Sequence, residues 1–175
     1  LYGLGDIHID SVLSKLKEKF KIDVVLEDVI IPYRETIRGT ATQRYKYKKQ
    51  SGGHGQYGDV EITFEPTGDY DKPYVFEEKI FGGAVPKSYF PAVEKGLIEA
   101  TKTGVLAGYP VLGVKATLID GSYHNVDSSE MAFKTATVMC FKEGLPKAKP
   151  ALLEPFVTLH VYVDEEYTGD IMSSF

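Results

Sequence analysis

A glycine-rich segment at residues 49–58, KQSGGHGQYG, carries the clearest sign of chemistry in this chain. Glycine lacks Cβ, so such a segment can adopt positive φ and bring its peptide groups close to a partner. Cations and tyrosines surround it: Arg44, Lys46, Lys48, Lys49, Tyr45, Tyr47 and Tyr57. Cations suit phosphates and aromatic rings stack on bases, so RNA is the first partner to consider.

Two other interpretations of this segment stand beside RNA contact. A plain hairpin tip also uses glycines, and a basic run is often a solvated strand face. A nucleotide-phosphate loop is disfavoured, because a P-loop requires Gly-Lys followed by Ser or Thr and the sequence has no such triplet. Residues 53–58 match G-x-G-x-x-G, but residues 59–64 alternate like a strand, so the dinucleotide-binding context is missing.

A second polar segment, DGSYHNVDSS at residues 120–129, holds a histidine, aspartates and three serines. His124 and Asp127 permit a hydrolase hypothesis, although the nucleophile elbow G-x-S-x-G is absent from the sequence. A metal site is unsupported, since no second His or Cys lies at ligand spacing. A third hypothesis is anion binding, because His124 precedes a predicted helix N-terminus with its free amides.

Residues 127–130 have the pattern of a capping box. Asp127 is expected to accept a hydrogen bond from the amide of Glu130, and the Glu130 carboxylate to bond back to the cap amide. The helix that follows should end at Gly144. Its expected core-facing residues are Met131, Ala132, Thr135, Ala136, Met139 and Cys140.

Charge is unevenly distributed along the 175 residues, of which 43% are hydrophobic. The net charge of −5 argues against a protein that binds nucleic acid over its whole surface. However, residues 38–59 contain five cations and one carboxylate, whereas residues 61–79 are mainly acidic. Any RNA contact is therefore expected at one end of the molecule.

A lone cysteine, Cys140, excludes an internal disulfide, and neither Cys/His metal spacings nor a run of about eighteen apolar residues occurs in the sequence. These features favour a reducing cytoplasm, with no metal site and no membrane span. The first residue is Leu1 rather than Met, and the last residues follow a turn without another element. We therefore expect a piece of a longer protein.

Apolar periodicity predicts the elements that position the two polar segments. A helix should begin at Asp10 or Ser11. The remaining expected elements are strands at 22–26 and 29–31, a long hairpin from 36–48 and 57–64, a strand at 74–80, a helix at 87–102 with Phe90, Val93, Leu97 and Ile98 inward, and strands at 111–119 and 156–163. The middle of the chain is therefore predicted to have the element order β-β-β-α-β-α. This order is typical of an α+β domain, here with parts of neighbouring domains on both sides.

Several motifs resemble those of bacterial elongation factor G. They are QSGGHGQYG at 50–58, LAGYPV at 106–111, GSYH at 121–124, VDSSE at 126–130 and FKEG at 141–144, with PYRETI at 32–37, AKP at 148–150, LLEP at 152–155 and TGD at 168–170. The resemblance implies the end of a third domain at 1–28, a fourth domain at 29–152 and the start of a fifth at 153–175. It implies a ribosomal-protein-like fold with a left-handed β-α-β crossover, against the usual right-handed preference, flanked by parts of ferredoxin-like domains.

The family's fourth domain is the arm that enters the decoding centre of the small ribosomal subunit during translocation. The resemblance implies that the tip loops contact RNA through Ser51, Gly52, Gly53, His54, Gly55, Gln56, Tyr57, Ser122, Tyr123, His124 and Asn125. Arg44, Lys46, Lys48 and Lys49 would form a basic strand face. The family commonly has arginine where His54 stands, which permits a paralogue that works in ribosome recycling or ribosome protection.

The implied partners are the ribosome, with its rRNA, tRNA and mRNA, for a monomeric cytoplasmic factor. GTP and Mg²⁺ would bind in an amino-terminal domain of the longer protein, which is a GTPase in this family. This part is expected to hold no cofactor and no catalytic residue. An enzyme that uses His124 and Asp127 is the alternative of another class.

Overall fold

The computed structural model describes residues 5–27, 30–50, 53, 55–158 and 160–174. The chain is divided into two compact units, Leu1–Ile31 and Pro32–Phe175. In the first unit, helix α1 spans Asp6–Phe20 and buries none of its residues. It begins before the predicted Asp10 or Ser11. Residues 22–27 and 30–31 form no strand, because β-branched residues need a neighbouring strand to pair with.

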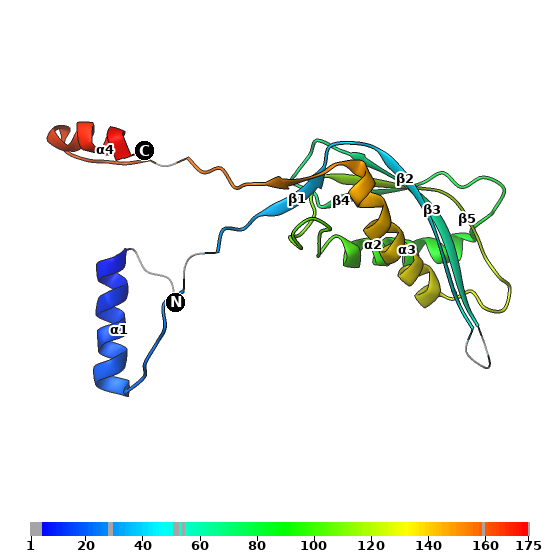
Figure 1. The fold of residues 1–175 in the computed structure, drawn as a ribbon, viewed down its shortest axis with the longest axis horizontal. Coiled ribbons are helices and arrows are strands. Elements are labelled where there is room, and N and C mark those ends of the chain that lie inside the picture. The colour runs from blue at the N-terminus through cyan, green and yellow to red at the C-terminus, as the bar shows by residue number, and fades with distance from the viewer. Residues whose placement is uncertain (1–4, 28–29, 51–52, 54, 159, 175) are drawn as a thin grey trace. The chain divides into compact units, whose positions relative to one another are not determined.

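The second unit is built on a four-stranded sheet in the order β2-β3-β5-β4. The strands are β2 (Ala41–Lys49), β3 (Gln56–Pro66), β4 (Tyr74–Glu78) and β5 (Val114–Ser122). The first three strands across the sheet are antiparallel, whereas β4 runs parallel to β5. Helix α2 (Phe90–Ala100) connects β4 to β5, and α3 (Glu130–Gly144) follows β5. The predicted order β-β-β-α-β-α and the α+β class are therefore confirmed (Figure 1).

The core lies between the sheet and the two helices, which pack side by side (Figure 1). Strand residues Val60, Ile62 and Phe64 are almost fully buried there. The predicted helix faces need correction. On α2, Ile98 is exposed, because the buried side there is formed by Ala92, Val93, Gly96, Leu97 and Ala100. On α3, Met131 is exposed whereas Phe133 and Phe141 are fully buried, because the buried side is rotated from the predicted one.

A second, two-stranded sheet pairs β1 (Arg34–Ile37) with β6 (Pro150–Leu153). The predicted strand at 36–48 is thus split, because the chain turns at Gly39, whose amide bonds the Ala148 carbonyl at 2.9 Å. The predicted strand at 156–163 is also wrong: none of its described residues is in a strand. The strand that does form near this part of the chain is β6, which pairs with β1 of the same unit.

Short helical segments complete the chain. They are η1 (Lys87–Tyr89), η2 (Leu145–Ala148), η3 (Glu165–Tyr167) and α4 (Thr168–Ser174). Around the four-stranded sheet, β1 and β6 lie at one end, and the end of β2 and the start of β3 lie at the other (Figure 1). Across the described ranges, no helix is both long and apolar enough to cross a membrane.

Candidate functional site

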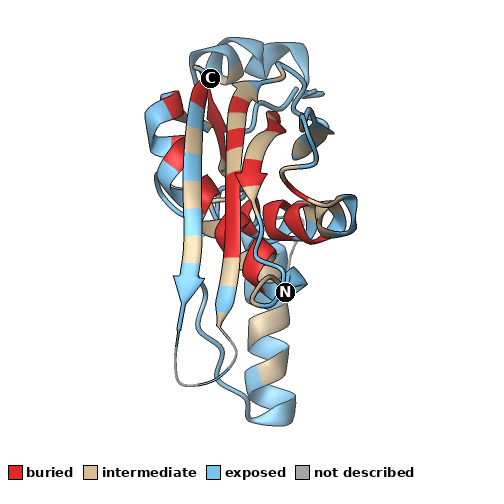
Figure 2. Ribbon diagram, turned by 90° about the vertical axis from the view of Figure 1, so that its right-hand side faces the viewer, coloured by how far each residue is buried: buried red, intermediate tan, exposed pale blue. Residues whose placement is uncertain are grey.

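The two polar segments meet at the end of the β2–β3 hairpin. The amide of Gly55 donates to Asp127 Oδ1 at 3.0 Å, and the amide of Tyr57 donates to the Asp127 carbonyl at 2.8 Å. Tyr57 also forms an isolated parallel bridge with Ser128. Segments about 70 residues apart therefore form one tip. Figure 2 shows buried residues concentrated in the body of the sheet, and exposed residues where β2 ends and β3 begins.

A cleft of about 200 Å³ opens between these segments. Its lining combines two cations, two side-chain amides, a tyrosine, an imidazole and one carboxylate, from Lys48, Lys49, Gln50, Gly55, Gln56, Tyr57, His124 and Asp127. Gly53, Tyr123 and Asn125, in the same two segments, are exposed. The predicted contacts Ser51, Gly52 and His54 lie outside the described residues. Such a lining offers ionic, hydrogen-bonding and stacking groups to a polyanion with flat bases.

The His124 ring is held by its own loop. Its Nδ1 accepts the amides of Val126 at 3.3 Å and Asp127 at 3.2 Å. The His124 amide and carbonyl are both bonded to Ser128, through Oγ at 2.9 Å and the amide at 3.1 Å. The ring centroid lies 6.2 Å from that of Tyr57. The imidazole is thus oriented, with more than half of its side-chain surface exposed.

Asp59 is a fully buried carboxylate under the tip that the sequence did not single out as functional. Arg44 donates to it twice, at 3.0 and 2.7 Å, and Ser122 Oγ donates at 2.6 Å. Because Ser122 has one hydroxyl hydrogen, the Tyr57 hydroxyl must donate to Ser122 Oγ across their 2.7 Å contact. A chain of hydrogen bonds therefore links Arg44 to Tyr57. Burial alone would raise the pKa of Asp59, but the bonds from Arg44 and Ser122 lower it below its ordinary value.

The four cations of the predicted basic strand face fall into two pairs, because only Arg44 and Lys46 lie close to carboxylates of this network. Arg44 also contacts Asp120 at 3.1 Å and Glu61 at 3.6 Å, and these carboxylates with Asp59 raise its pKa. Lys46 lies 3.9 Å from Asp59. In the described parts of the chain, Lys48 and Lys49 have no carboxylate within ion-pair distance, so their charges are uncompensated. The rings of Tyr45 and Tyr47 pack against the core rather than facing a ligand.

The helix-cap prediction for Asp127 and Glu130 is wrong. The N-cap of α3 is Ser129, whose Oγ accepts the Ala132 amide at 3.2 Å. Ser128 is extended in its bridge to Tyr57, so the helix cannot begin early enough for Asp127 to cap it. The Asp127 carboxylate instead faces Gly55, and Glu130 is an exposed residue in the first turn.

The geometry also disfavours a hydrolase. Asp127 Oδ2 lies 3.4 Å from His124 Nδ1, but that nitrogen already accepts two backbone amides. The three nearby serines are occupied: Ser122 donates to Asp59, Ser128 to the Tyr57 carbonyl, and Ser129 caps α3. In the described part of the tip, no nucleophile and base therefore face each other. Among the described residues, no group of His, Cys, Asp and Glu could hold a metal ion.

Glu35 is a second buried carboxylate that the sequence did not single out. It accepts the amides of Leu106 at 2.8 Å, Ala107 at 2.8 Å and Tyr109 at 3.0 Å. A Cβ on Gly104 would fall within the space of the Glu35 carboxyl group. The segment at 104–110 is therefore folded around one carboxylate on β1. Its position, at the end opposite the tip, indicates a structural role.

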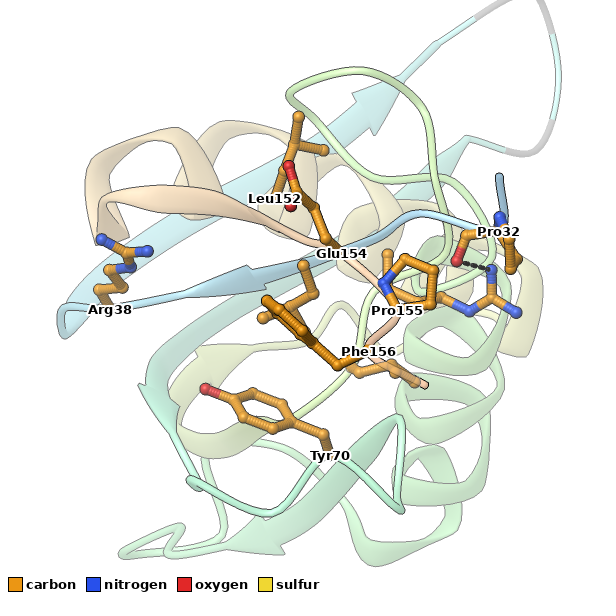
Figure 3. A pocket seen from close by; sticks show the side chains of 10 residues that line it. Pro32, Arg38, Tyr70, Leu152, Glu154, Pro155 and Phe156 are labelled. Atoms are coloured by element: carbon orange, nitrogen blue, oxygen red, sulfur yellow. Dashed lines mark hydrogen bonds between the residues drawn. The ribbon is translucent and has the colours of Figure 1, made fainter. Parts of the chain in front are cut away.

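A larger cavity of about 630 Å³ lies beside β1 and β6 (Figure 3). Leucines, prolines and the rings of Tyr70 and Phe156 form much of its wall. Arg34 at its edge bonds the carbonyls of Pro32 and Tyr33. None of the described lining residues is a Ser, Cys, His or Asp, so the cavity lacks the groups of a hydrolytic site.

Comparisons with known proteins identify the family. The family model described as elongation factor G, domain IV, matches residues 30–149, more than half of the chain. The chain belongs to the elongation factor G family. It is 50% identical over 173 residues to elongation factor G of Fervidobacterium nodosum, and 49% identical over 170 residues to an elongation factor G-like protein of Thermotoga maritima.

These matches cover 99% and 97% of the chain but 25% of each relative, so the chain spans about a quarter of their length. A crystal structure of a Thermus thermophilus protein superposes with a TM-score of 0.78 at 45% identity. It covers 86% of this chain, which covers 22% of that protein. The resemblance to elongation factor G and the fold class predicted from it are confirmed by these matches.

Proposed function

We propose that this chain is the RNA-contacting arm of an elongation factor G-type translation factor. In this proposal the arm enters the decoding centre of the small ribosomal subunit and promotes the movement of tRNA and mRNA. The supporting observation is the tip itself, where two distant segments meet around a cleft lined by Lys48, Lys49, His124 and Gln56. The tip lies at the end of the unit opposite β1 and β6 (Figure 1).

The groups at the tip have separable roles in this proposal. Lys48 and Lys49 attract phosphates, because no described carboxylate neutralises them. His124, Tyr123 and Asn125 are exposed and can bond or stack on nucleotides. Gln56 accepts from the Tyr47 hydroxyl at 3.0 Å, which leaves its amide NH₂ for a ligand. Arg44 and Lys46 contribute less to RNA binding, since Asp59 and Asp120 offset their charge.

The longer protein is proposed to be a monomeric, cytoplasmic GTPase that works on the ribosome and its rRNA. A paralogue in ribosome recycling or protection is the second candidate. This second candidate is supported by the name of the Thermotoga maritima relative, an elongation factor G-like protein. At 49% identity, that relative is almost as similar to this chain as the Fervidobacterium nodosum factor at 50%. A translocation assay separates the two, because a paralogue of the second kind would not move tRNA and mRNA.

This chain alone is expected to bind no guanine nucleotide. Its sequence has no Gly-Lys-Ser/Thr triplet, so the phosphate cradle is missing. Calorimetric titration with GTP and Mg²⁺ should release no binding heat, while the full-length factor should bind. A micromolar Kd for the chain, about −8 kcal/mol, would contradict the assignment of nucleotide binding to another domain.

His124→Ala and Gln56→Ala in the full-length factor should slow tRNA and mRNA movement. A stacking contact of about 1–3 kcal/mol corresponds to roughly ten- to a hundredfold in rate. Ribosome-stimulated GTP hydrolysis should stay nearly unchanged, because its site is proposed to lie in another domain. Rapid-kinetic measurement of both steps on one preparation tests this division.

His160→Ala is the matched control, because His160 is a histidine outside both tip segments and outside the matched domain at residues 30–149. It should leave both steps unchanged. Equal losses of hydrolysis and movement in His124→Ala, or loss of its fold, would refute the proposal. Both tip side chains are exposed, so the fold should survive their removal.

A further inference from the structure

Asp127 presents a carboxylate in a cleft proposed to receive RNA. Of its side-chain surface, 29% is exposed, and the carboxylate lies on the same wall as His124. A negative charge at this place opposes phosphate binding. Since it does not cap α3, its presence requires another physical reason.

Three groups of Asp127 each bond a different part of the tip. Its Oδ1 accepts the Gly55 amide at 3.0 Å, and its carbonyl accepts the Tyr57 amide at 2.8 Å. Its own amide donates to His124 Nδ1 at 3.2 Å. One residue therefore connects the glycine-rich segment, the start of β3 and the imidazole. The bond at Oδ1 is charge-assisted, which makes it stronger than a bond between neutral groups.

Gly55 is shaped to receive this carboxylate. A Cβ at Gly55 would lie 2.9 Å from Asp127 Cγ, 3.0 Å from Oδ2 and 3.1 Å from Oδ1. The first distance is shorter than real Cβ contacts and the other two are tighter than usual, so a larger residue at 55 would shift the carboxylate by a few tenths of an ångström. The glycine is thus needed for close approach of the Asp127 side chain to the Gly55 amide.

The amides of Val126 and Asp127 also decide which imidazole nitrogen carries the proton. Both donate to Nδ1 at 3.2–3.3 Å, and these two bonds favour an unprotonated Nδ1 over a proton shared with Asp127 Oδ2, which lies farther away at 3.4 Å. In a neutral imidazole the proton then resides on Nε2. The ring accordingly offers Nε2–H as a hydrogen-bond donor, which a phosphate, ribose or base oxygen of RNA would accept.

We propose that Asp127 is a positioning residue that joins the two tip segments and holds His124 as an Nε2–H donor toward an acceptor oxygen of RNA. This inference rests on the proposed function. Asp127 itself makes no contact with RNA in this scheme. Its contribution is to keep the imidazole, Gly55 and the start of β3 in one arrangement before the arm meets its target.

The test uses three variants of the full-length factor and one control variant. Asp127→Ala removes the side-chain bond to Gly55, and Gly55→Ala pushes the carboxylate away from it. Loss of one charge-assisted bond should slow tRNA and mRNA movement about tenfold in Asp127→Ala, and the weakened bond in Gly55→Ala should slow it in the same direction by less, with GTP hydrolysis unchanged in both. Asp127→Asn keeps an acceptor oxygen, so it should retain movement within about threefold. Glu130→Gln, the matched control, removes an equal charge nearby and should have no effect.

A spectroscopic measurement separates positioning from general damage. In the factor labelled with ¹⁵N-histidine, and with the His124 signal assigned by its loss in His124→Ala, Nδ1 should resonate as unprotonated. Asp127→Ala keeps both backbone amides but releases the bond to Gly55 that holds their loop in place, so this signal should shift toward a mixture of tautomers. Asp127→Asn keeps an acceptor for Gly55 and should restore the signal. An unchanged His124 signal and normal movement in Asp127→Ala would overturn the positioning role.

The two proposals fail differently. If Asp127→Ala alters the tautomer but His124→Ala leaves movement intact, the positioning stands and RNA contact by His124 is refuted. If His124→Ala slows movement but Asp127→Ala changes neither movement nor tautomer, the RNA contact stands and the positioning is refuted. Equal loss of movement in Asp127→Asn and Asp127→Ala would overturn the role given to the acceptor oxygen, because the two variants share only the loss of charge.

Discussion

Replacing Glu35 by alanine should destabilise the second unit by about 3–5 kcal/mol, the largest effect expected from any single substitution considered for this protein. The side chain is 1% exposed and accepts three backbone amides from the 106–109 segment. Its removal leaves those donors without their partner and opens a cavity in the same place. Urea unfolding of the chain, followed by circular dichroism, measures the loss.

Two further variants define the cause. Glu35→Gln preserves volume but supplies one acceptor oxygen for three amides, and turns an NH₂ group toward donors, so it should recover only part of the loss. Glu78→Ala removes an exposed carboxylate at the end of β4 and should change stability by less than about 0.5 kcal/mol. A Glu35→Ala variant as stable as Glu78→Ala would show that the segment does not depend on the carboxylate.

The order of elements could be read from the sequence because the signals are local. Alternation over 57–64 and the turn residues around the glycines predicted the hairpin, and helix periodicity predicted α2 and α3. The strand at 156–163 failed despite its strong β propensity, since no described residue pairs with it. Strand formation depends on a partner, which propensity does not report.

The residue types of the sequence predicted the two tip segments but not the two buried carboxylates. Glycine density marked one tip segment, and the place of His124 ahead of a predicted helix marked the other. Asp59 and Glu35 escaped notice, because a carboxylate inside a strand usually marks the solvent face. Only their partners, Arg44 for one and three amides for the other, make burial possible. The error at Asp127 has a related cause: its pattern fits a cap, but the bridge between Tyr57 and Ser128 moves the helix start.

Arg44→Ala should destabilise the protein at neutral pH by about 2–4 kcal/mol, because it leaves the Asp59 carboxylate buried with fewer compensating donors. Asp59 is fully buried, whereas Arg44 is 44% exposed, so water partly replaces the lost guanidinium and the lower half of this range is favoured. Arg44→Lys keeps the charge without the two-pronged bond and should lose less. Urea unfolding suits the measurement, since urea does not screen charges.

The pH dependence should change sign in this variant. In the native protein the pKa of Asp59 lies below its ordinary value, so its stabilising effect is present above the unfolded pKa of about 4 and is lost as pH falls through the folded pKa. Without Arg44, burial becomes the dominant influence and raises the Asp59 pKa above that of the unfolded chain. Protonation then favours the folded state, so Arg44→Ala should recover stability relative to the native protein as pH falls from 7 toward 5. Adding Asp59→Asn should remove this recovery, because the group that takes up the proton is gone. A constant difference between the native protein and Arg44→Ala across this range would place the source of the destabilisation elsewhere than in the uncompensated Asp59 charge.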